Sequence, residues 1–332
     1  MNRRPPTIIS FPVAVIIYTL FAGWLFYPYA QQLSRIQLLF LPAGSVIGAA
    51  GVFLLSRRWV LSFFASLAGG AIFGFGTFAC SFYCYHPAAG LVNAFLPWFF
   101  MPAVFFYHWA KFKPNIVAIF SGLFLLLPIL FVLSAYEVAA GMQFYPVPLN
   151  TTLTVQSLTG LIDPTGVKPD IFAPGFYHVS IAGLVIGFIL LIRTSRIWTI
   201  ILFVAAVFAA FFTPILNVPP AIWVSVPVLI CSLLIAEGLE ALVLSGASDS
   251  KWLLVSVAVL LLAILFNILL TSRTGVFPQS VGLYGIGVVT VLLIYFIAQS
   301  KLAWHGTRML VLYPAIFIDI IISTRYIIGR IF

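Results

Sequence analysis

The sequence predicts an all-α protein, a bundle of about eleven transmembrane helices with a cytoplasmic N-terminus. Three observations support this fold class. The chain is 63% hydrophobic and 7% charged with a mean hydropathy of +1.18, which leaves too little polar surface for a soluble protein of 332 residues. Its apolar residues form runs of the length that a helix needs to cross a hydrocarbon layer about 30 Å thick. Its Lys and Arg residues fall in the short gaps between those runs.

Each expected span is an apolar run bounded by charged residues, prolines or polar clusters. In chain order the spans cover residues 8–28, 37–56, 59–83, 91–110, 115–136, 176–192, 197–216, 221–244, 252–272, 279–299 and 308–328. The first run follows MNRRPP, as the apolar part of a signal sequence would, but it lacks a small-residue cleavage site. We therefore expect it to remain as the first helix.

The last run has two interpretations. Asp319, Ser323, Tyr326 and Arg330 recur at helical spacing, so one face of this helix is polar and isoleucines cover the rest. The helix either spans the membrane, with Asp319 facing a polar passage or another helix, or lies flat at an interface. We expect it to span; in the alternative, which would also accommodate Arg325, the bundle has ten spans.

The distribution of basic residues sets the orientation, because cytoplasmic loops of membrane proteins are enriched in Lys and Arg. With the N-terminus inside, the outer segments hold only Arg35, Lys168 and Arg273. The cytoplasmic segments hold Arg3, Arg4, Arg57, Arg58, Lys111, Lys113, Arg193, Arg196, Lys251, Lys301 and Arg308. The net charge of +9 therefore needs no nucleic-acid partner. We expect an integral protein of a bacterial inner (plasma) membrane, with the lipid bilayer and other membrane subunits as partners.

A long polar segment divides the chain. Residues 1–136 form a first block of five spans, residues 137–178 a loop outside the cytoplasm, and residues 179–332 a second block of five or six spans. Glycines four residues apart mark expected close contacts between helices, because small residues let helix backbones approach in lipid. These pairs are Gly44 with Gly48, Gly70 with Gly74, and Gly183 with Gly187.

Carboxylates within the apolar runs are the first candidate sites, since an ionised group at the centre of a bilayer is costly and usually functional. Asp319 lies near the middle of the last run. Glu237 and Glu240 lie on one helical face and could bind a cation or relay protons. Alternatively, these two glutamates reach the interface or pair with a lysine such as Lys251.

Cys80, Cys84 and His86 form a second group, at the outer end of the third run. Thiolate and imidazole are zinc ligands, but three ligands are fewer than the four of a closed structural site. A redox-active thiol pair or simple packing of small apolar cysteines are the alternatives. We predict no metal site, and no motif implies a cofactor.

The outer loop provides a third group. His178, with His86, Glu137 and Asp170, forms a possible general acid/base set at the membrane surface. No nucleophile elbow, HExxH motif or Gly-rich phosphate loop accompanies it. Whether the protein is an enzyme therefore stays open, and the residues favour a non-enzyme.

Three functions are compatible with these residues. The first is a transport-type, permease-like bundle for a solute or lipid, in which Pro97, Pro102, Pro128 and Pro227 mark bent or broken helices. The second is a membrane-embedded transferase or hydrolase acting on a lipid-linked substrate at the outer leaflet. The third is a non-catalytic subunit of a larger membrane complex.

Overall fold

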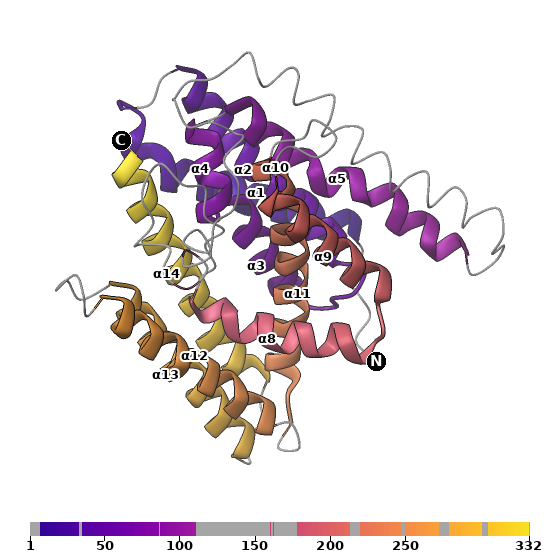
Figure 1. The fold of residues 1–332 in the computed structure, drawn as a ribbon, viewed down its shortest axis with the longest axis vertical. Coiled ribbons are helices and arrows are strands. Elements are labelled where there is room, and N and C mark those ends of the chain that lie inside the picture. The colour runs from indigo at the N-terminus through magenta and orange to yellow at the C-terminus, as the bar shows by residue number, and fades with distance from the viewer. Residues whose placement is uncertain are drawn as a thin grey trace.

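The computed structural model describes residues 7–32, 35–85, 87–110, 160, 162, 178–212, 220–246, 250–271, 279–300 and 305–331. Within these residues all regular structure is helical, which confirms the predicted all-α class (Figure 1). The first part holds α1 (Thr7–Phe26), the short 3-10 helix η1 (Tyr27–Tyr29), α2 (Arg35–Ser56), α3 (Phe63–Gly74), α4 (Thr77–Tyr85) and α5 (Pro87–Ala110). The second part holds α8 (His178–Arg193), α9 (Ile197–Phe211), α10 (Pro220–Trp223), α11 (Ser225–Leu244), α12 (Ser250–Thr271), α13 (Gln279–Gln299) and α14 (His305–Ile331).

Six of the described helices are long and apolar enough to cross a membrane, namely α1, α2, α11, α12, α13 and α14. A seventh span results if α3 and α4, which meet at an angle of 42°, cross together. The apolar part of α5, α8 and α9 are shorter, and the predicted run 115–136 lies outside the described residues. The helices support an integral membrane protein, whereas the predicted number of about eleven spans is not established.

Close helix crossings occur where glycines were predicted to make them. A Cβ on Gly238 of α11 would overlap the backbone of Gly183 where α8 crosses α11, and a Cβ on Gly187 would overlap the Leu234 carbonyl (Figure 1). Gly70 and Gly74 of α3 lie in the same way against backbone oxygens of α2. Because any side chain at these positions would force the helices apart, the small residues fix the packing of the bundle.

The predicted third span, 59–83, is divided in two. The chain bends at Phe75 and Gly76, and a Cβ on Gly76 would overlap the Ile72 carbonyl oxygen. A break leaves backbone carbonyls without their helical partners. The Phe75 carbonyl accepts a hydrogen bond from the Thr324 hydroxyl of α14 at 2.7 Å, so α14 stabilises the break.

The prolines do not coincide with this break. Helix α5 continues through Pro97 and Pro102, and Pro227 lies in the first turn of α11, where a missing N–H costs little. Pro128 lies outside the described residues. The observed break therefore coincides with Gly76 and the Thr324 hydrogen bond rather than with the predicted prolines.

Helix α14 packs inside the bundle with its polar face inward. Asp319, Ser323 and Thr324 are buried, and α14 contacts α13, α4, α3 and α8. An interfacial helix would instead turn these polar groups toward water. The packing therefore supports the spanning interpretation of the last run.

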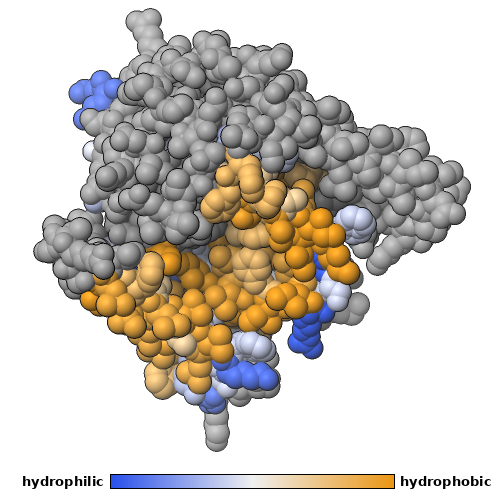
Figure 2. Space-filling view, viewed as in Figure 1, coloured by the Kyte–Doolittle hydropathy of each residue, from blue (hydrophilic) through white to orange (hydrophobic). Residues whose placement is uncertain are grey.

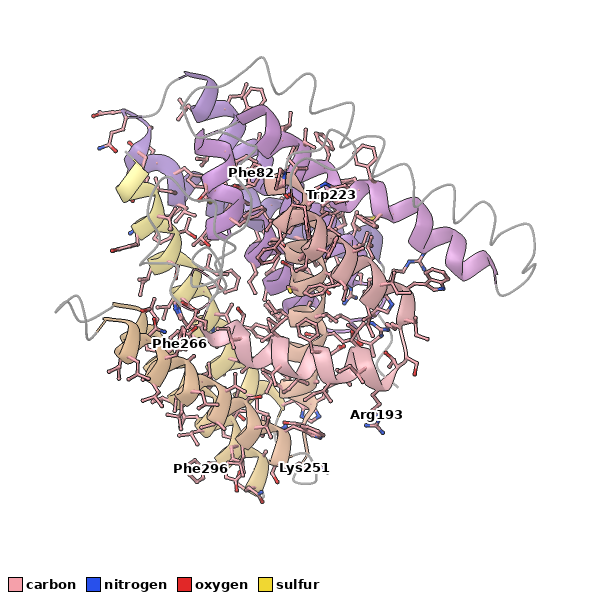
Figure 3. The ribbon with its side chains drawn as sticks, in the orientation of Figure 1. Phe82, Arg193, Trp223, Lys251, Phe266 and Phe296 are labelled. Carbon is pink, nitrogen blue, oxygen red and sulfur yellow. The ribbon has the colours of Figure 1, made fainter. Side chains whose placement is uncertain are left out.

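On the surface of the bundle, apolar side chains point outward. Figure 2 shows an apolar face over the region of α8, α12 and α13. Figure 3 labels Phe296 and Lys251 at one end of α13 and α12, and Arg193 near the end of α8. Leu262 and Phe296 are 64% and 63% exposed, as expected for side chains that face lipid.

Candidate functional site

A buried hydrogen-bonded pair, His178 and Asp319, joins the start of α8 to the middle of α14. The His178 Nδ1 atom lies 3.0 Å from Asp319 Oδ1, and the two side chains are 0% and 2% exposed. The second carboxylate oxygen, Oδ2, accepts the Val179 backbone N–H at 2.9 Å. Since Val179 is in the first turn of α8, the carboxylate satisfies an N–H that has no partner within its helix and meets the positive end of the helix dipole.

Two further polar side chains adjoin the pair. The Ser323 hydroxyl, one turn along α14, lies 3.4 Å from Asp319 Oδ1. The ring of Tyr284 on α13 packs edge-on against the His178 ring, with 4.3 Å between centroids. The Tyr284 hydroxyl donates to the Ile162 carbonyl at 2.9 Å. Three helices, α8, α13 and α14, therefore build the site.

The remaining nitrogen of His178 is not satisfied. Nε2 is buried and has no hydrogen-bond partner among the described residues. An unpaired buried polar group costs roughly 1–3 kcal/mol, so such a group in a native structure requires an explanation. In a membrane protein the explanation to test first is a ligand, a water or a transferred proton at that nitrogen.

Two arginines of α14, Arg308 and Arg325, flank Asp319 along the helix. Arg308, about 17 Å earlier along α14, donates from Nη1 to the carbonyls of Val243, at 3.0 Å, and Ser245 at the end of α11. Arg325, about 9 Å later, stacks its guanidinium over Trp24 at 4.5 Å. Arg308 is thus held by the end of α11 and Arg325 by α1.

The other two described carboxylates have separate partners. Glu237 forms a bidentate ion pair with Arg196, with both N–O distances 2.9 Å. Arg196 follows Ser195, which adopts a φ of 51°, and its guanidinium lies 5.7 Å from the Trp59 ring centroid. The partner of Glu237 is thus Arg196, whereas Lys251, the lysine considered from sequence, lies beside the ring of Trp252.

Glu240 binds backbone rather than a cation. Its Oε1 atom accepts the N–H groups of Leu61 at 2.8 Å and Ser62 at 2.6 Å, immediately before α3. Both glutamates therefore hold α11 to neighbouring turns. The basic residues Arg57, Arg196 and Arg308 gather around the same half of α11, as residues of one membrane face should. Which face is cytoplasmic stays a prediction.

The cysteine group is described only in part. Cys80 is buried in α4, and its thiol lies 3.6 Å from the Phe75 carbonyl oxygen. The side chain of Cys84 and all of His86 lie outside the described residues. Among the residues that the structure describes, no three His, Cys, Asp or Glu side chains are placed to bind a metal ion.

The predicted outer acid/base set cannot be assembled from the described residues. Glu137, Asp170 and His86 lie outside them, so only His178 of this set has a described position. His178 lies instead in the buried pair with Asp319. From the sequence, Asp319 was expected to face a polar passage or another helix, not to join the acid/base set.

The sequence signal for the pair was the cost of a lone intramembrane charge. It allowed either a polar passage or a partner on another helix for Asp319, and it did not identify His178 as that partner. Comparisons of the chain with protein-family models, curated proteins and solved structures give no match.

Proposed function

We propose that the protein is a transport-type membrane protein in which the His178–Asp319 pair binds and releases a proton during the transport cycle. The observation that carries this proposal is the buried pair itself, with a His178 Nε2 atom that has no partner among the described residues. Intramembrane Asp and His side chains facing a bundle interior are typical of proton relays in transporters.

The bonding of Asp319 couples protonation to helix packing. As a carboxylate, Asp319 accepts from His178 Nδ1 and from the Val179 N–H, both on α8. A proton on one carboxylate oxygen replaces an acceptor with a donor, which weakens the contact between α14 and α8. The remaining polar side chains described at the pair, Tyr284 and Ser323, carry no charge near neutral pH and cannot replace it.

The break between α3 and α4 supports the same function. Transporters commonly place binding sites at discontinuous helices, where backbone groups are freed. Thr324, which holds the Phe75 carbonyl, lies five residues after Asp319, about 8 Å along the same helix. A displacement of α14 would therefore change the ion pair and the broken helix together.

Reconstitution into proteoliposomes tests the proposal. Currents are recorded on solid-supported membranes after concentration jumps of sugars, amino acids, organic acids and nucleosides, at several pH values. We expect at least one solute class to give a pH-dependent current that Asp319→Asn abolishes. Glu237→Gln is the matched control, because it makes the same acid-to-amide change in a carboxylate whose partner is Arg196. Currents that survive in Asp319→Asn would refute the proposal.

A second function is favoured by the orientation of His178. Asp319 binds Nδ1 and leaves Nε2 to act on a substrate, which is the arrangement of a general base oriented by a carboxylate. A transferase or hydrolase acting on a lipid-linked substrate would use Nε2 to remove a proton from water or a hydroxyl group. Hydrolysis of a fluorescent phospholipid ester in mixed micelles, lost in His178→Asn and retained in Glu237→Gln, would support this function instead.

A further inference from the structure

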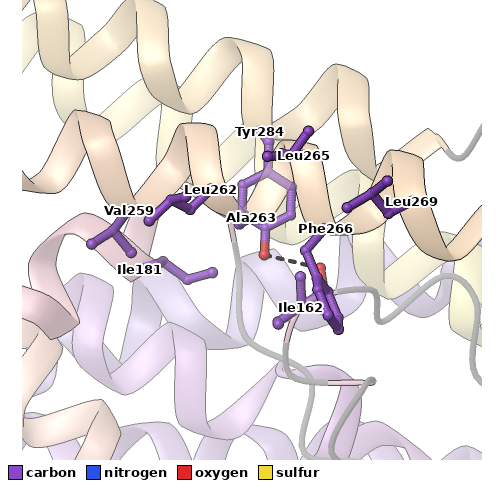
Figure 4. Close-up of a pocket in the computed structure, with 9 residues that line it drawn as sticks. All are labelled: Ile162, Ile181, Val259, Leu262, Ala263, Leu265, Phe266, Leu269 and Tyr284. Carbon is purple, nitrogen blue, oxygen red and sulfur yellow. Dashed lines mark hydrogen bonds between the residues drawn. The ribbon is translucent and has the colours of Figure 1, made fainter.

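A groove opens between α8 and α12 on the apolar face of the molecule (Figure 4). We propose that it binds one acyl chain of a membrane phospholipid. The groove has a volume of about 460 Å³, within the range of roughly 300–1,000 Å³ typical of ligand sites. The proposal does not depend on proton transfer by the His178–Asp319 pair.

The shape of the groove follows from a small residue between larger ones. Val259, Ala263 and Phe266 recur on one face of α12, and Ala263 leaves a recess between its neighbours. Ile181 of α8 and Ile162 close the opposite wall (Figure 4).

The Ile162 wall is fixed by hydrogen bonds. The Ile162 carbonyl accepts the Tyr284 hydroxyl at 2.9 Å and lies 3.5 Å from the Asn267 amide nitrogen. Asn267 also donates to Ala263 at 2.9 Å, and Ser280 of α13 lies 3.4 Å from its side-chain oxygen. The Ile162 wall of the groove is thus held to α12 and α13 by hydrogen bonds rather than formed by a loosely placed side chain.

The described lining of the groove is unsuited to a polar ligand. Every described lining residue except Tyr284 is apolar, and the Tyr284 hydroxyl already donates to Ile162. A bound water needs two to four polar partners, which this lining does not offer. A saturated hydrocarbon chain requires none.

The position of the groove identifies the source of that chain. Its outer rim consists of Leu262, Leu265 and Leu269 of α12, which are 64%, 52% and 60% exposed. Helix α12 is one of the candidate spans, so this exposed apolar rim faces the hydrocarbon layer. Phospholipid acyl chains are the molecules present there, and the groove offers one of them a concave site on the helix surface.

The groove adjoins the buried ion pair. Tyr284 forms part of its lining and packs against His178 with ring centroids 4.3 Å apart. A bound acyl chain would hold the Tyr284 ring against His178 from the lipid side. The bound acyl chain would therefore restrict the mobility of the His178–Asp319 site without contacting its charged groups.

Photolabelling tests the proposal. The protein is placed in nanodiscs of palmitoyl-oleoyl phosphatidylcholine with a trace of phosphatidylcholine that carries a diazirine in one acyl chain. After illumination, labelled peptides are mapped by mass spectrometry. We expect labelling of residues 259–269 to exceed that around Leu20 of α1, which is 69% exposed on a helix surface and reports ordinary contact with lipid.

Substitutions that fill the groove distinguish a bound chain from surrounding lipid. Ala263→Trp should lower labelling of residues 259–269 at least about fivefold, a loss of binding free energy of about 1 kcal/mol. Ala258→Trp, on the same helix, exposed and outside the groove, should leave it unchanged. Ile181→Trp fills the groove from α8 and provides the same test if Ala263→Trp does not elute as a monodisperse protein. Equal labelling in all variants would mean surrounding lipid only and would overturn the proposal.

Discussion

Removal of the Asp319 carboxylate should destabilise the protein more than removal of the His178 ring. Asp319→Ala leaves two buried donors of α8 without an acceptor, the His178 Nδ1–H and the Val179 N–H. His178→Ala leaves Asp319 with its bond to Val179 and the nearby Ser323 hydroxyl. The asymmetry follows from the backbone contact, which belongs to Asp319 alone.

The expected loss in the free energy of unfolding is smaller than it would be in a soluble protein. Breaking a buried ion pair in a soluble protein costs about 3–5 kcal/mol, but interhelical hydrogen bonds in a membrane protein average about 0.6 and reach about 1.7 kcal/mol. Two lost bonds near the upper value give about 3 kcal/mol for Asp319→Ala, and one gives about 1.5 kcal/mol for His178→Ala. The pair should show a coupling energy of about 1–1.5 kcal/mol in the double variant.

The free energy of unfolding in mixed micelles, titrated with a denaturing detergent, measures all three quantities. A double-mutant cycle isolates the contact between the two side chains, provided that each variant keeps its helical circular dichroism. Strictly additive effects, or a larger loss for His178→Ala than for Asp319→Ala, would refute the pairing and the role of the Val179 N–H.

Three further predictions concern the contacts that hold the bundle. Glu240→Ala should lower the free energy of unfolding by about 1–2 kcal/mol, because two N–H groups at the start of α3 lose their acceptor. Glu237→Ala should lower it by about 0–1 kcal/mol, since the arginine partner of Glu237 is 28% exposed and can be solvated. Thermal unfolding of both variants in detergent checks this order, and equal losses would contradict it. Arg308→Met should lower the free energy of unfolding by about 1–3 kcal/mol, because the carbonyls at the end of α11 lose their donor. Arg308→Lys should recover part of that loss. Resistance to protease in detergent measures the stability of both variants. Thr324→Val should speed amide hydrogen exchange at the break between α3 and α4 by about fivefold, a cost of about 1 kcal/mol, with exchange in α12 as the unaffected reference.

The positions of several helices could be predicted because hydropathy and charge both mark helix ends. The run predicted at 279–299 matches α13, and the run at 252–272 differs from α12 by two residues at the start and one at the end. At each end the apolar run stops where a polar or charged residue can reach the interface. This rule depends on composition alone, so one sequence is sufficient for it.

The break between α3 and α4 could not be predicted in the same way. Apolar residues continue through Phe75 and Gly76, so the hydropathy of the run does not change where the helix ends. The break lies at Gly76, where a Cβ would overlap the Ile72 carbonyl oxygen, and it is held by the Thr324 hydroxyl, which is 249 residues from Phe75 in the chain. The pattern of neighbouring residues gives no information on contacts between residues so far apart in the sequence.

The same limit applies to the candidate site, and it changes how the three described carboxylates should be ranked. In the sequence, Glu237 and Glu240 share a helical face and Asp319 stands alone, which makes the glutamates the more obvious pair. In the structure each glutamate is satisfied by its own partner at one end of α11, Arg196 for Glu237 and the start of α3 for Glu240. Asp319 is the described carboxylate whose partner, His178, retains a buried nitrogen with no hydrogen bond to any described residue. Because an unpaired buried nitrogen is costly, the search for a transported or reacting group should begin between α8 and α14.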